Sequence, residues 1–391
     1  MRQRQPRPGV IVPLTAILLI FLLGMVAFVV DIGWITVAQS DLQNAADAAA
    51  LAGANALMDG FVTYHLPQQS TARKAAALAA AQTRARTTAK QYAQGNAAGG
   101  VSSLMLLDAD IEFGFTDASN NYTPSPSYTG YPNTIKVTIR RDRKANAPLG
   151  LFFGQLMGVS STSLAATAAA TIYTGTIENL KITNTNAGML PMTYDVNHWN
   201  DFLKTGKGPD GTSLTDDAGD PDILVYPSNK STGNFGQLSL NDSHVGQNTE
   251  ASWVSNGMTA SDIQALRDHN LIPLSSHPDQ WDWQGETGFK ASLVMDINRG
   301  AGKIFLMPLF KPKNAAAKTY QAGESKGANY QYNIVQIVGI RIVPTTDVNG
   351  KILVQPAAVI EPNAIFVPNS IAPAGTTTTL VTTFTAPRLS Q

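Results

Sequence analysis

Hydrophobic and polar positions divide the chain into one long apolar run, two alanine-rich segments and a series of short alternating runs. The apolar run holds 21 uncharged, mainly apolar residues from Val10 to Val30. As a helix it would reach about 31 Å at 1.5 Å per residue, the thickness of a bilayer's hydrocarbon core. Pro13 is compatible with this helix, because in the first turn its missing N–H has no partner to lose. The pattern predicts a transmembrane helix.

Charges on either side of this run predict its orientation. Arg2, Arg4 and Arg7 precede it with no acidic residue among them, whereas the charged residues that follow are acidic until Arg73. Positively charged flanks favour the cytoplasmic side of a membrane. We therefore expect a single-pass protein of the inner membrane, with a cytoplasmic N-terminus and residues 31–391 in the periplasm.

A cleavable signal peptide is the competing interpretation. Thr36-Val37-Ala38 offers small residues at a passable cleavage site. A signal peptide has an apolar region of about 7–15 residues, however, and this run is longer and continues into helix-compatible sequence. The length favours a retained anchor.

Small side chains dominate the segment that follows, residues 42–54. Ala45, Ala49 and Gly53 repeat every four residues, and Ala46, Ala50 and Ala54 form a second series beside them. Residues four apart lie on one face of a helix, so these series form two ridges of small side chains. Such ridges allow another backbone to approach closely. The segment is predicted to be a helix built for packing.

The order of these features resembles the N-terminal domain of the Tad (tight adherence) family of Flp pilus-assembly proteins, the TadE/TadG-like group. The resemblance rests on a basic tip with Gly9, the apolar run, Val30-Asp31-Ile32-Gly33, and the sequence DLQNAADAAALA at residues 41–52. It covers about 50 residues. Leu14 stands where typical type IV prepilins carry Glu, which argues against prepilin-peptidase processing.

The resemblance implies a single-pass envelope protein of a pilus or secretion apparatus. Its expected partners are the lipid bilayer and other Tad/Flp pilus-assembly proteins, with self-association as a further expectation. The residues expected to mediate helix packing or partner contact are Asp31, Gly33, Leu42, Gln43, Asn44, Ala45, Asp47, Ala49, Leu51 and Gly53.

Composition narrows the function further. Charged residues make up 14% of the chain, and the 28 Lys and Arg residues are balanced by 28 Asp and Glu residues, so no net field attracts nucleic acid. Cysteine is absent. The chain therefore has no disulfide, thiol nucleophile or Cys-ligated zinc.

A second helix is expected after a loop at residues 59–69, which contains a glycine and a proline. Ser70 is a capping residue type, and the helix should continue to about Gln94 and end at Gly95. Its alanine surface predicts an antiparallel hairpin with the first helix. Its basic residues fall on two sides and predict a solvated face opposite the acidic first helix; they are Arg73, Lys74, Arg84, Arg86 and Lys90.

The remaining sequence changes to strand periodicity. Strands are expected at residues 111–115, 134–140 and 165–173, and the apolar run at residues 148–157 predicts a short buried or membrane-proximal helix. Helices are expected at residues 249–255 and at residues 261–269, the latter capped by Ser261. Further apolar or alternating runs predict a β-rich domain; they lie at residues 177–182, 189–194, 223–226, 292–297, 303–310, 332–343, 352–354, 364–367 and 379–384.

The predicted fold class is α+β. A single N-terminal transmembrane helix continues into an Ala-rich helical hairpin, followed by a pilin-like antiparallel sheet and a β-rich C-terminal domain. The expected divisions are a cytoplasmic tip and anchor at residues 1–30, the hairpin at 31–100, the small sheet at 101–175 and the extracytoplasmic β-rich domain at 176–391.

Acidic clusters offer candidate metal sites. Asp117 follows a strand as in the D-x-S-x-S site of a von Willebrand A domain, but Asn121 replaces the last Ser and no alternating strands and helices follow, so a turn is favoured. The loop at residues 206–221 is rich in Asp, with Asp222 just after it. It does not meet the spacing of an EF-hand, which favours a solvated loop.

Histidines and tryptophans complete the candidates. His269 and His277 with Asp279 and Asp282 are of residue types that bind metals or act as acid and base, but polar surface is the favoured interpretation. Trp281 and Trp283 are read as core residues or as an exposed aromatic pair, with the core favoured. We assign no catalytic residue, cofactor or metal, and expect a non-enzymatic assembly protein. The alternative is a membrane-tethered exported hydrolase or Ca²⁺-dependent adhesin acting through residues 176–391.

Overall fold

The structure is a computed structural model that describes most of the chain after its N-terminal tip. The described residues are 11–227, 234–241, 243, 246–276, 283–286, 289–312, 324–326, 329–347, 350–377 and 379–390. Arg2, Arg4, Arg7 and Gly9 lie outside them. The orientation deduced from the arginines therefore stays a prediction.

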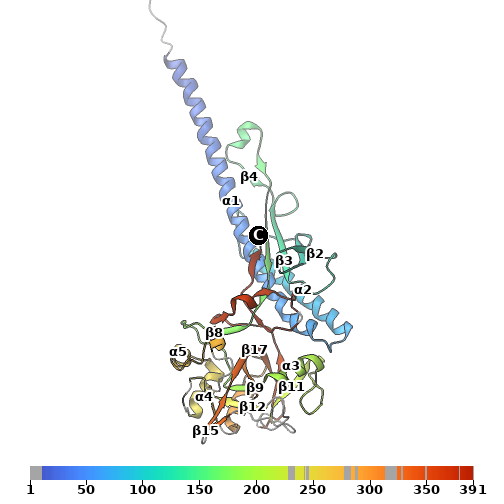
Figure 1. Cartoon of the computed structure of the whole chain (residues 1–391). Helices are drawn as coiled ribbons and strands as arrows, with labels where there is room; N and C mark the ends of the chain where they lie inside the picture. Colours follow the sequence, from blue (N-terminus) through green and yellow to red (C-terminus); the bar gives the residue numbers. More distant parts are fainter. Residues whose placement is uncertain are drawn as a thin grey trace, which may run out of the picture.

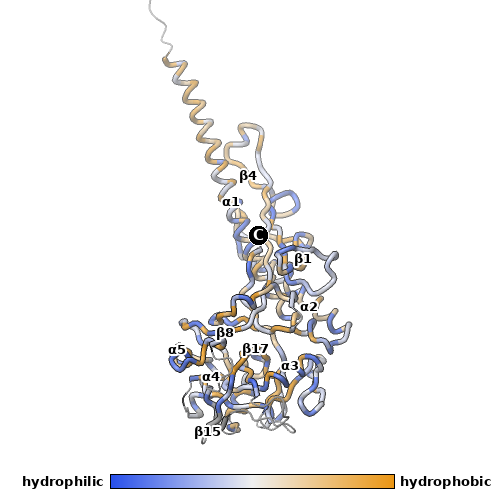
Figure 2. The backbone as a smooth tube through the Cα atoms, in the orientation of Figure 1, coloured by the Kyte–Doolittle hydropathy of each residue, from blue (hydrophilic) through white to orange (hydrophobic). Residues whose placement is uncertain are grey.

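One continuous helix, α1 (Ile11–His65), runs through the molecule (Figure 1). Its 55 residues correspond to a length of about 82 Å. The side chains of residues 11–30 are exposed apart from a half-buried Ala27, and this apolar part of α1 projects beyond the rest of the fold (Figure 2). The second half of the helix is packed against the protein.

The prediction of a loop directly after Met58 is wrong, because α1 continues to His65. Phe61 and Val62 are almost fully buried in this added stretch. The free energy gained by burying these side chains outweighs the poor helix propensity of a Gly and of β-branched residues. The helix ends at His65, two residues before Pro67.

Helix α2 (Thr71–Gln94) packs antiparallel on α1, as predicted. The Ser70 hydroxyl accepts a hydrogen bond from the Arg73 amide at 3.2 Å, and Gly95 ends the helix, so both predicted boundaries are confirmed. A Cβ added at Gly53 would lie 3.3 Å from Ala89 Cβ, and one added at Gly60 would lie 2.7 Å from the Ala77 carbonyl oxygen. The two helices therefore approach closely at Gly53 and Gly60.

A five-stranded antiparallel sheet covers the same part of α1. Among the described residues its order is β2-β1-β3-β6-β23. Residues facing α1 alternate along the central strands: Ile135, Val137 and Ile139 on β3, and three alanines on β6, are buried. Its strands are β1 (Ile111–Thr116), β2 (Tyr122–Pro124), β3 (Thr134–Arg141), β6 (Leu164–Thr171) and β23 (Arg388–Ser390). The C-terminal strand thus joins a sheet built mainly from residues 111–171.

A larger sheet forms the far end of the molecule. Its order in the described residues is β10-β11-β18-β17-β14-β9-β12-β13-β16-β15. All its pairs are antiparallel except β9 with β14. The strands are β9 (Met192–Asp195), β10 (Leu214–Thr215), β11 (Pro221–Tyr226), β12 (Phe235–Leu238), β13 (Trp283–Glu286), β14 (Ile304–Phe310), β15 (Glu324–Lys326), β16 (Asn329–Tyr332), β17 (Ile334–Val343) and β18 (Ile352–Pro356).

The end of α1 enters the core of this larger body. Val62 and Leu66 share a buried cluster with Trp199 and Phe202 of α3 (Val196–Thr205) and with Ile297 of α6 (Ala291–Arg299). A second cluster contains Trp253 of α4 (Gln247–Asn256), side chains of α5 (Ala260–Asp268), and Trp283. The core interpretation of Trp283 is confirmed, and Trp281 lies outside the described residues.

Small sheets connect the two bodies. They pair β19 (Val359–Ile360), β22 (Thr383–Phe384), β7 (Tyr173–Thr174) and β21 (Ala372–Pro373) in one group, and β8 (Ile177–Leu180) with β20 (Ala364–Phe366) in another. The mixed α and β architecture agrees with the predicted fold class. The four expected domains stay predictions.

Two local predictions in the C-terminal region are wrong. Residues 292–297 form part of helix α6, not a strand, because Leu293, Val294 and Ile297 lie on one helical face and are buried together. Helix α5 is capped by Thr259, which exchanges hydrogen bonds with Asp262 in a capping box, so Ser261 is not the cap. Helix α4 confirms the helix expected at residues 249–255.

The glycines of α1 yield a matched stability test. Replacing Gly60 by Ala should lower the free energy of unfolding by about 1–3 kcal/mol, because the new methyl group would overlap the Ala77 carbonyl oxygen of α2. Gly33→Ala is the control, since a Cβ there meets nothing within 4 Å and helix propensity favours Ala. Thermal unfolding of the detergent-solubilised protein, followed by circular dichroism, measures both. A Gly60→Ala protein as stable as the unchanged chain would contradict the close contact.

Candidate functional site

Asp31 marks the point where α1 changes from exposed apolar residues to packed ones. Its side chain is 6% exposed, although it belongs to a charged residue type at the end of an uncharged run. The carboxylate accepts hydrogen bonds from the backbone amides of Phe152 at 2.8 Å, Phe153 at 3.1 Å and Gly154 at 2.6 Å. Three amide donors stabilise a buried carboxylate that has no cationic partner among the ion pairs of the described residues.

These amides belong to a hairpin, here called the finger and defined as residues 149–162. Its arms are β4 (Leu149–Gly150) and β5 (Ser161–Thr162), and its tip contains the 3₁₀ turn η2 (Gly154–Met157). Gly158, at φ 81°, reverses the chain after that turn. The prediction of a helix at residues 148–157 is wrong, because this segment contains strand β4 and the 3₁₀ turn η2. The tip residues Leu156 and Met157 are also exposed and not buried.

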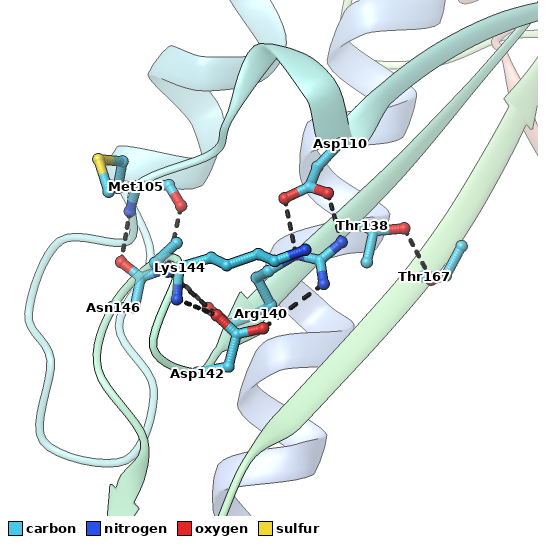
Figure 3. A network of polar contacts seen from close by, with 9 residues as sticks. Met105, Asp110, Thr138, Arg140, Asp142, Lys144, Asn146 and Thr167 are labelled. Atoms are coloured by element: carbon cyan, nitrogen blue, oxygen red, sulfur yellow. Dashed lines mark hydrogen bonds and ion pairs between the residues drawn. The ribbon is translucent and has the colours of Figure 1, made fainter.

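The last residue of β3, Arg141, holds the base of the finger, and Arg140 beside it forms an ion pair with Asp110. Arg141 is 5% exposed and donates hydrogen bonds to the carbonyl oxygens of Ala98, Gly99 and Pro148, and to others nearby. Arg140 pairs with Asp110 through two nitrogens, and Figure 3 shows this pair beside Asp142. The hydrogen bonds that Arg140 donates to the Asp110 carboxylate raise the pKa of Arg140. The finger is therefore fixed at its base by Arg141 and nearer its tip by Asp31.

Asn146 strengthens the same base. Its side-chain amide donates to the Met105 carbonyl oxygen at 2.9 Å, and its oxygen accepts from the Met105 amide at 2.7 Å (Figure 3). The turn that enters the finger is thereby joined to the segment after α2.

Glutamines on α1 bond to the edge of β6. Gln43 donates to the Thr167 carbonyl oxygen at 3.3 Å and to Asp47 at 2.7 Å, while Gln39 donates to the Ala165 carbonyl oxygen at 2.9 Å. Strand β23 pairs with β6 only at residues 169–171. The glutamines therefore bind carbonyl groups of β6 beyond the point where its pairing with β23 stops, while β3 pairs with β6 along its whole length. Asp47 orients Gln43.

The other predicted packing residues fall into two groups. Leu42, Ala45, Ala49 and Gly53 are buried against α2 or the small sheet, and Leu51 is half-buried. Gly33 and Asn44 are exposed on α1. Sequence reasoning missed Gln39 and Arg141. A Gln four residues before Gln43 was the available signal for the first, whereas Arg141 depends on contacts that no local pattern reveals.

Comparisons with known proteins agree with the N-terminal pattern. Residues 9–56 match the Tad family model, described as "Putative Flp pilus-assembly TadE/G-like". The chain carries a TadE/G-like segment. This confirms the resemblance seen in the sequence, and the Tad segment contains Asp31, Gln43 and both ridges of small residues. No curated protein and no solved structure matches the chain.

The Tad segment also contains the candidate membrane span. In the described part of the chain, α1 is the helix that is long and apolar enough to cross a bilayer, and its most apolar window is not buried by any other part of the protein. The segment thus combines an uncovered apolar half with a half that contributes to the protein's own core.

The acidic loop at residues 206–221 contributes to structure. Asp220 pairs with Arg73 of α2 at 2.7 Å, and Gln355 donates to both Asp216 and Asp222 at 2.9 and 2.8 Å. Within the described ranges no group of three His, Asp or Glu residues is arranged to hold a metal ion. The expected Asp117 turn is confirmed, since its carboxylate accepts from the Ser119 and Asn121 amides.

The histidine cluster cannot be assembled from the described residues. His269 is the C-cap residue directly after α5. His277, Asp279 and Asp282 lie outside the described residues. The structure therefore gives no support to the hydrolase alternative. Arg84, a residue of the basic face expected to be solvated, pairs with Asp59 of α1, and both side chains are exposed.

The carboxylate of Asp31 can be tested by local exchange. Asp31→Asn keeps the shape of the side chain but removes its charge, so the finger should open more readily, by about 1–3 kcal/mol. Backbone amides at residues 152–154 should then exchange with deuterium about 5- to 150-fold faster. Asp59→Asn is the matched control on the same helix, because its exposed ion pair contributes little. Unchanged exchange in Asp31→Asn would show that the carboxylate does not hold the finger.

Asp222 gives a pH-dependent prediction. It is 4% exposed, and burial, with the charges of Asp216 and Asp220, raises its pKa to about 6. The folded chain therefore keeps a proton that the unfolded chain loses near pH 4, so the free energy of unfolding falls as pH rises from about 4 to about 6. Asp222→Asn should remove this fall and exceed the unchanged protein in stability at pH 7 by up to about 2–3 kcal/mol.

Thermal unfolding at pH 4 and at pH 7 measures the effect. The difference between Asp222→Asn and the unchanged protein should be small at pH 4 and should grow toward pH 7. Asp217→Asn is the control, because it removes an exposed carboxylate from the same loop. A difference that does not grow with pH would contradict the assignment.

Proposed function

We propose that the chain is a membrane-anchored structural component of a Tad/Flp-type pilus or secretion apparatus. The observation that carries this proposal is the division of α1 within the Tad segment. Residues 11–30 form an uncovered apolar helix of membrane-spanning length. The same helix continues as the central packing element of the folded part that follows, called here the outer body (residues 31–390). The chain would act by assembly and anchoring, without catalysis.

The expected location is the inner membrane, with the N-terminus in the cytoplasm and the remaining bulk in the periplasm. The arginines before the span and the acidic residues after it support this orientation. In this arrangement Asp31 lies at the periplasmic boundary, and the larger sheet lies farthest from the membrane (Figure 1).

Other Tad/Flp assembly proteins are the proposed partners, and a second copy of the chain is a further one. Most small residues of the Tad segment are buried within the protein itself. We therefore expect partners to bind the part of α1 that stays exposed. Gly33, Val37, Ser40 and Asn44 lie along that exposed side at helical spacing. No described feature favours the Ca²⁺-dependent adhesin or hydrolase instead.

Membrane extraction tests the anchor. After alkaline carbonate treatment the protein should stay with the membrane pellet, and protease added to the periplasmic side of intact spheroplasts should remove all but a short N-terminal fragment. A chain with Leu18, Phe21 and Leu22 replaced by Lys should lose membrane retention. Release of the unchanged protein into the soluble fraction would refute the anchor.

Pilus formation tests the assembly role. Deletion of the coding region in the producing bacterium should abolish or strongly reduce surface pili, as counted by electron microscopy. Reintroduced full-length chain should restore them, whereas an exported chain that lacks residues 11–30 should not. Normal piliation without the protein would contradict the proposed function.

A further inference from the structure

The finger carries an exposed apolar tip beside the end of the candidate span. Phe152 is 62% exposed, Leu156 83% and Met157 86%, and Val159 is also exposed. Such side chains are costly to leave in water when they lie together. Residues 145–177 contain no charged side chain at all. The finger is therefore an uncharged segment that buries Leu149 and Leu151 at its base and exposes the apolar side chains of its tip.

Its position relative to α1 is fixed by contacts already described. Asp31, the first charged residue after the span, binds the amides at residues 152–154. Figure 1 shows the finger alongside α1, with its tip directed toward the helix's N-terminal half. Leu156 and Met157 belong to the turn η2 at this tip, which points toward the N-terminal half of α1 (Figure 1). If α1 crosses a bilayer, these side chains reach the level of its outer leaflet.

Backbone hydrogen bonding in the finger suits contact with lipid. A segment that enters the apolar part of a bilayer must satisfy its own amide groups. Leu151, Leu156, Gly158 and Val159 donate to carbonyl groups within the finger. The amides of residues 152–154 donate to Asp31. Few polar backbone groups at the tip therefore need water.

Aromatic residues lie at the same level. The ring of Trp34 on α1 packs on Phe152 with their centroids 5.6 Å apart. Tryptophan is enriched at the boundary between lipid tails and water, where its ring is partly apolar and its N–H reaches polar groups. Trp34 follows Asp31 by less than one helical turn. The contact extends the apolar surface of α1 sideways onto the finger.

We infer that the finger is a second membrane contact, which inserts Phe152, Leu156, Met157 and Val159 into the extracytoplasmic leaflet next to α1. This inference rests on the proposed anchor. A single helix can rotate and tilt in a bilayer, whereas a helix with a rigidly attached apolar finger has two points of contact. The finger would thereby fix the depth and the tilt at which α1 presents the outer body.

The absence of cysteine permits a direct test on the full-length chain. Single cysteines are introduced by Leu156→Cys, Met157→Cys, Val26→Cys or Leu389→Cys, and each is labelled with an environment-sensitive fluorophore. The proteins are reconstituted in vesicles of phosphatidylethanolamine and phosphatidylglycerol that contain a lipid with a nitroxide quencher high on its acyl chain. Leu389 is the matched control, an exposed leucine on the C-terminal strand away from the finger.

Probes at Leu156 and Met157 should be quenched several-fold more strongly than the probe at Leu389, and to an extent similar to the probe at Val26. Strong quenching at Val26 without quenching at Leu156 and Met157 would overturn the finger's role and leave the anchor intact. Absence of quenching at Val26 would overturn the anchor itself. The same quenching at Leu389 would show that the label, and not the finger, partitions into lipid, and would also overturn the inference.

Discussion

Close packing around α1 depends on small side chains at each place where the helix meets its neighbours. Gly53 and Gly60 let α2 approach until backbone and methyl groups touch, and the buried face of β6 is made of alanines. Larger residues at these positions would separate α1 from both neighbours and remove the hydrogen bonds that Gln39 and Gln43 make to β6. The alanine-rich composition of the Tad segment is therefore explained by contacts within the chain.

The same helix links environments that differ in solvent. Its first part is apolar on every side, which suits lipid, and its second part buries only one side and leaves the other to water. Asp31 lies at the change, where its charge is held by three amides of the finger. Farther on, Val62 and Leu66 enter the core of the large body. A displacement of α1 at the membrane would thus be passed directly to both sheets.

Strong periodic signals made the main elements predictable from sequence. The apolar run, the four-residue spacing of Ala45, Ala49 and Gly53, and the Ser70 cap each depend on local residue order, and each was found again in the fold. The end of α1 was misplaced, since only tertiary burial of Phe61 and Val62 keeps a glycine-containing stretch helical. The strand predicted at residues 292–297 was wrong, because a short run with consecutive apolar residues is compatible with a strand as well as with a helix.

The candidate site was only partly predictable for a similar reason. The sequence identified Asp31 and Gln43 as residues of the Tad pattern, but their partners lie 121 and 124 residues away along the chain. No local pattern indicates such pairings. The exposed state of the finger was also not predictable, because an uncharged apolar run is typical of a buried segment as well as of a lipid-facing one.

The central claim is that α1 passes unbroken from lipid into the protein's core. Spin labels placed one at a time along residues 14–58 in reconstituted vesicles would test it most directly, through collision with oxygen and with a water-soluble paramagnetic reagent. We expect labels up to residue 30 to collide with oxygen but not with the water-soluble reagent. Beyond residue 30, accessibility to that reagent should alternate between buried and exposed positions with a period of about 3.6 residues. Water contact throughout residues 14–30, or loss of the helical period near residue 31, would contradict it.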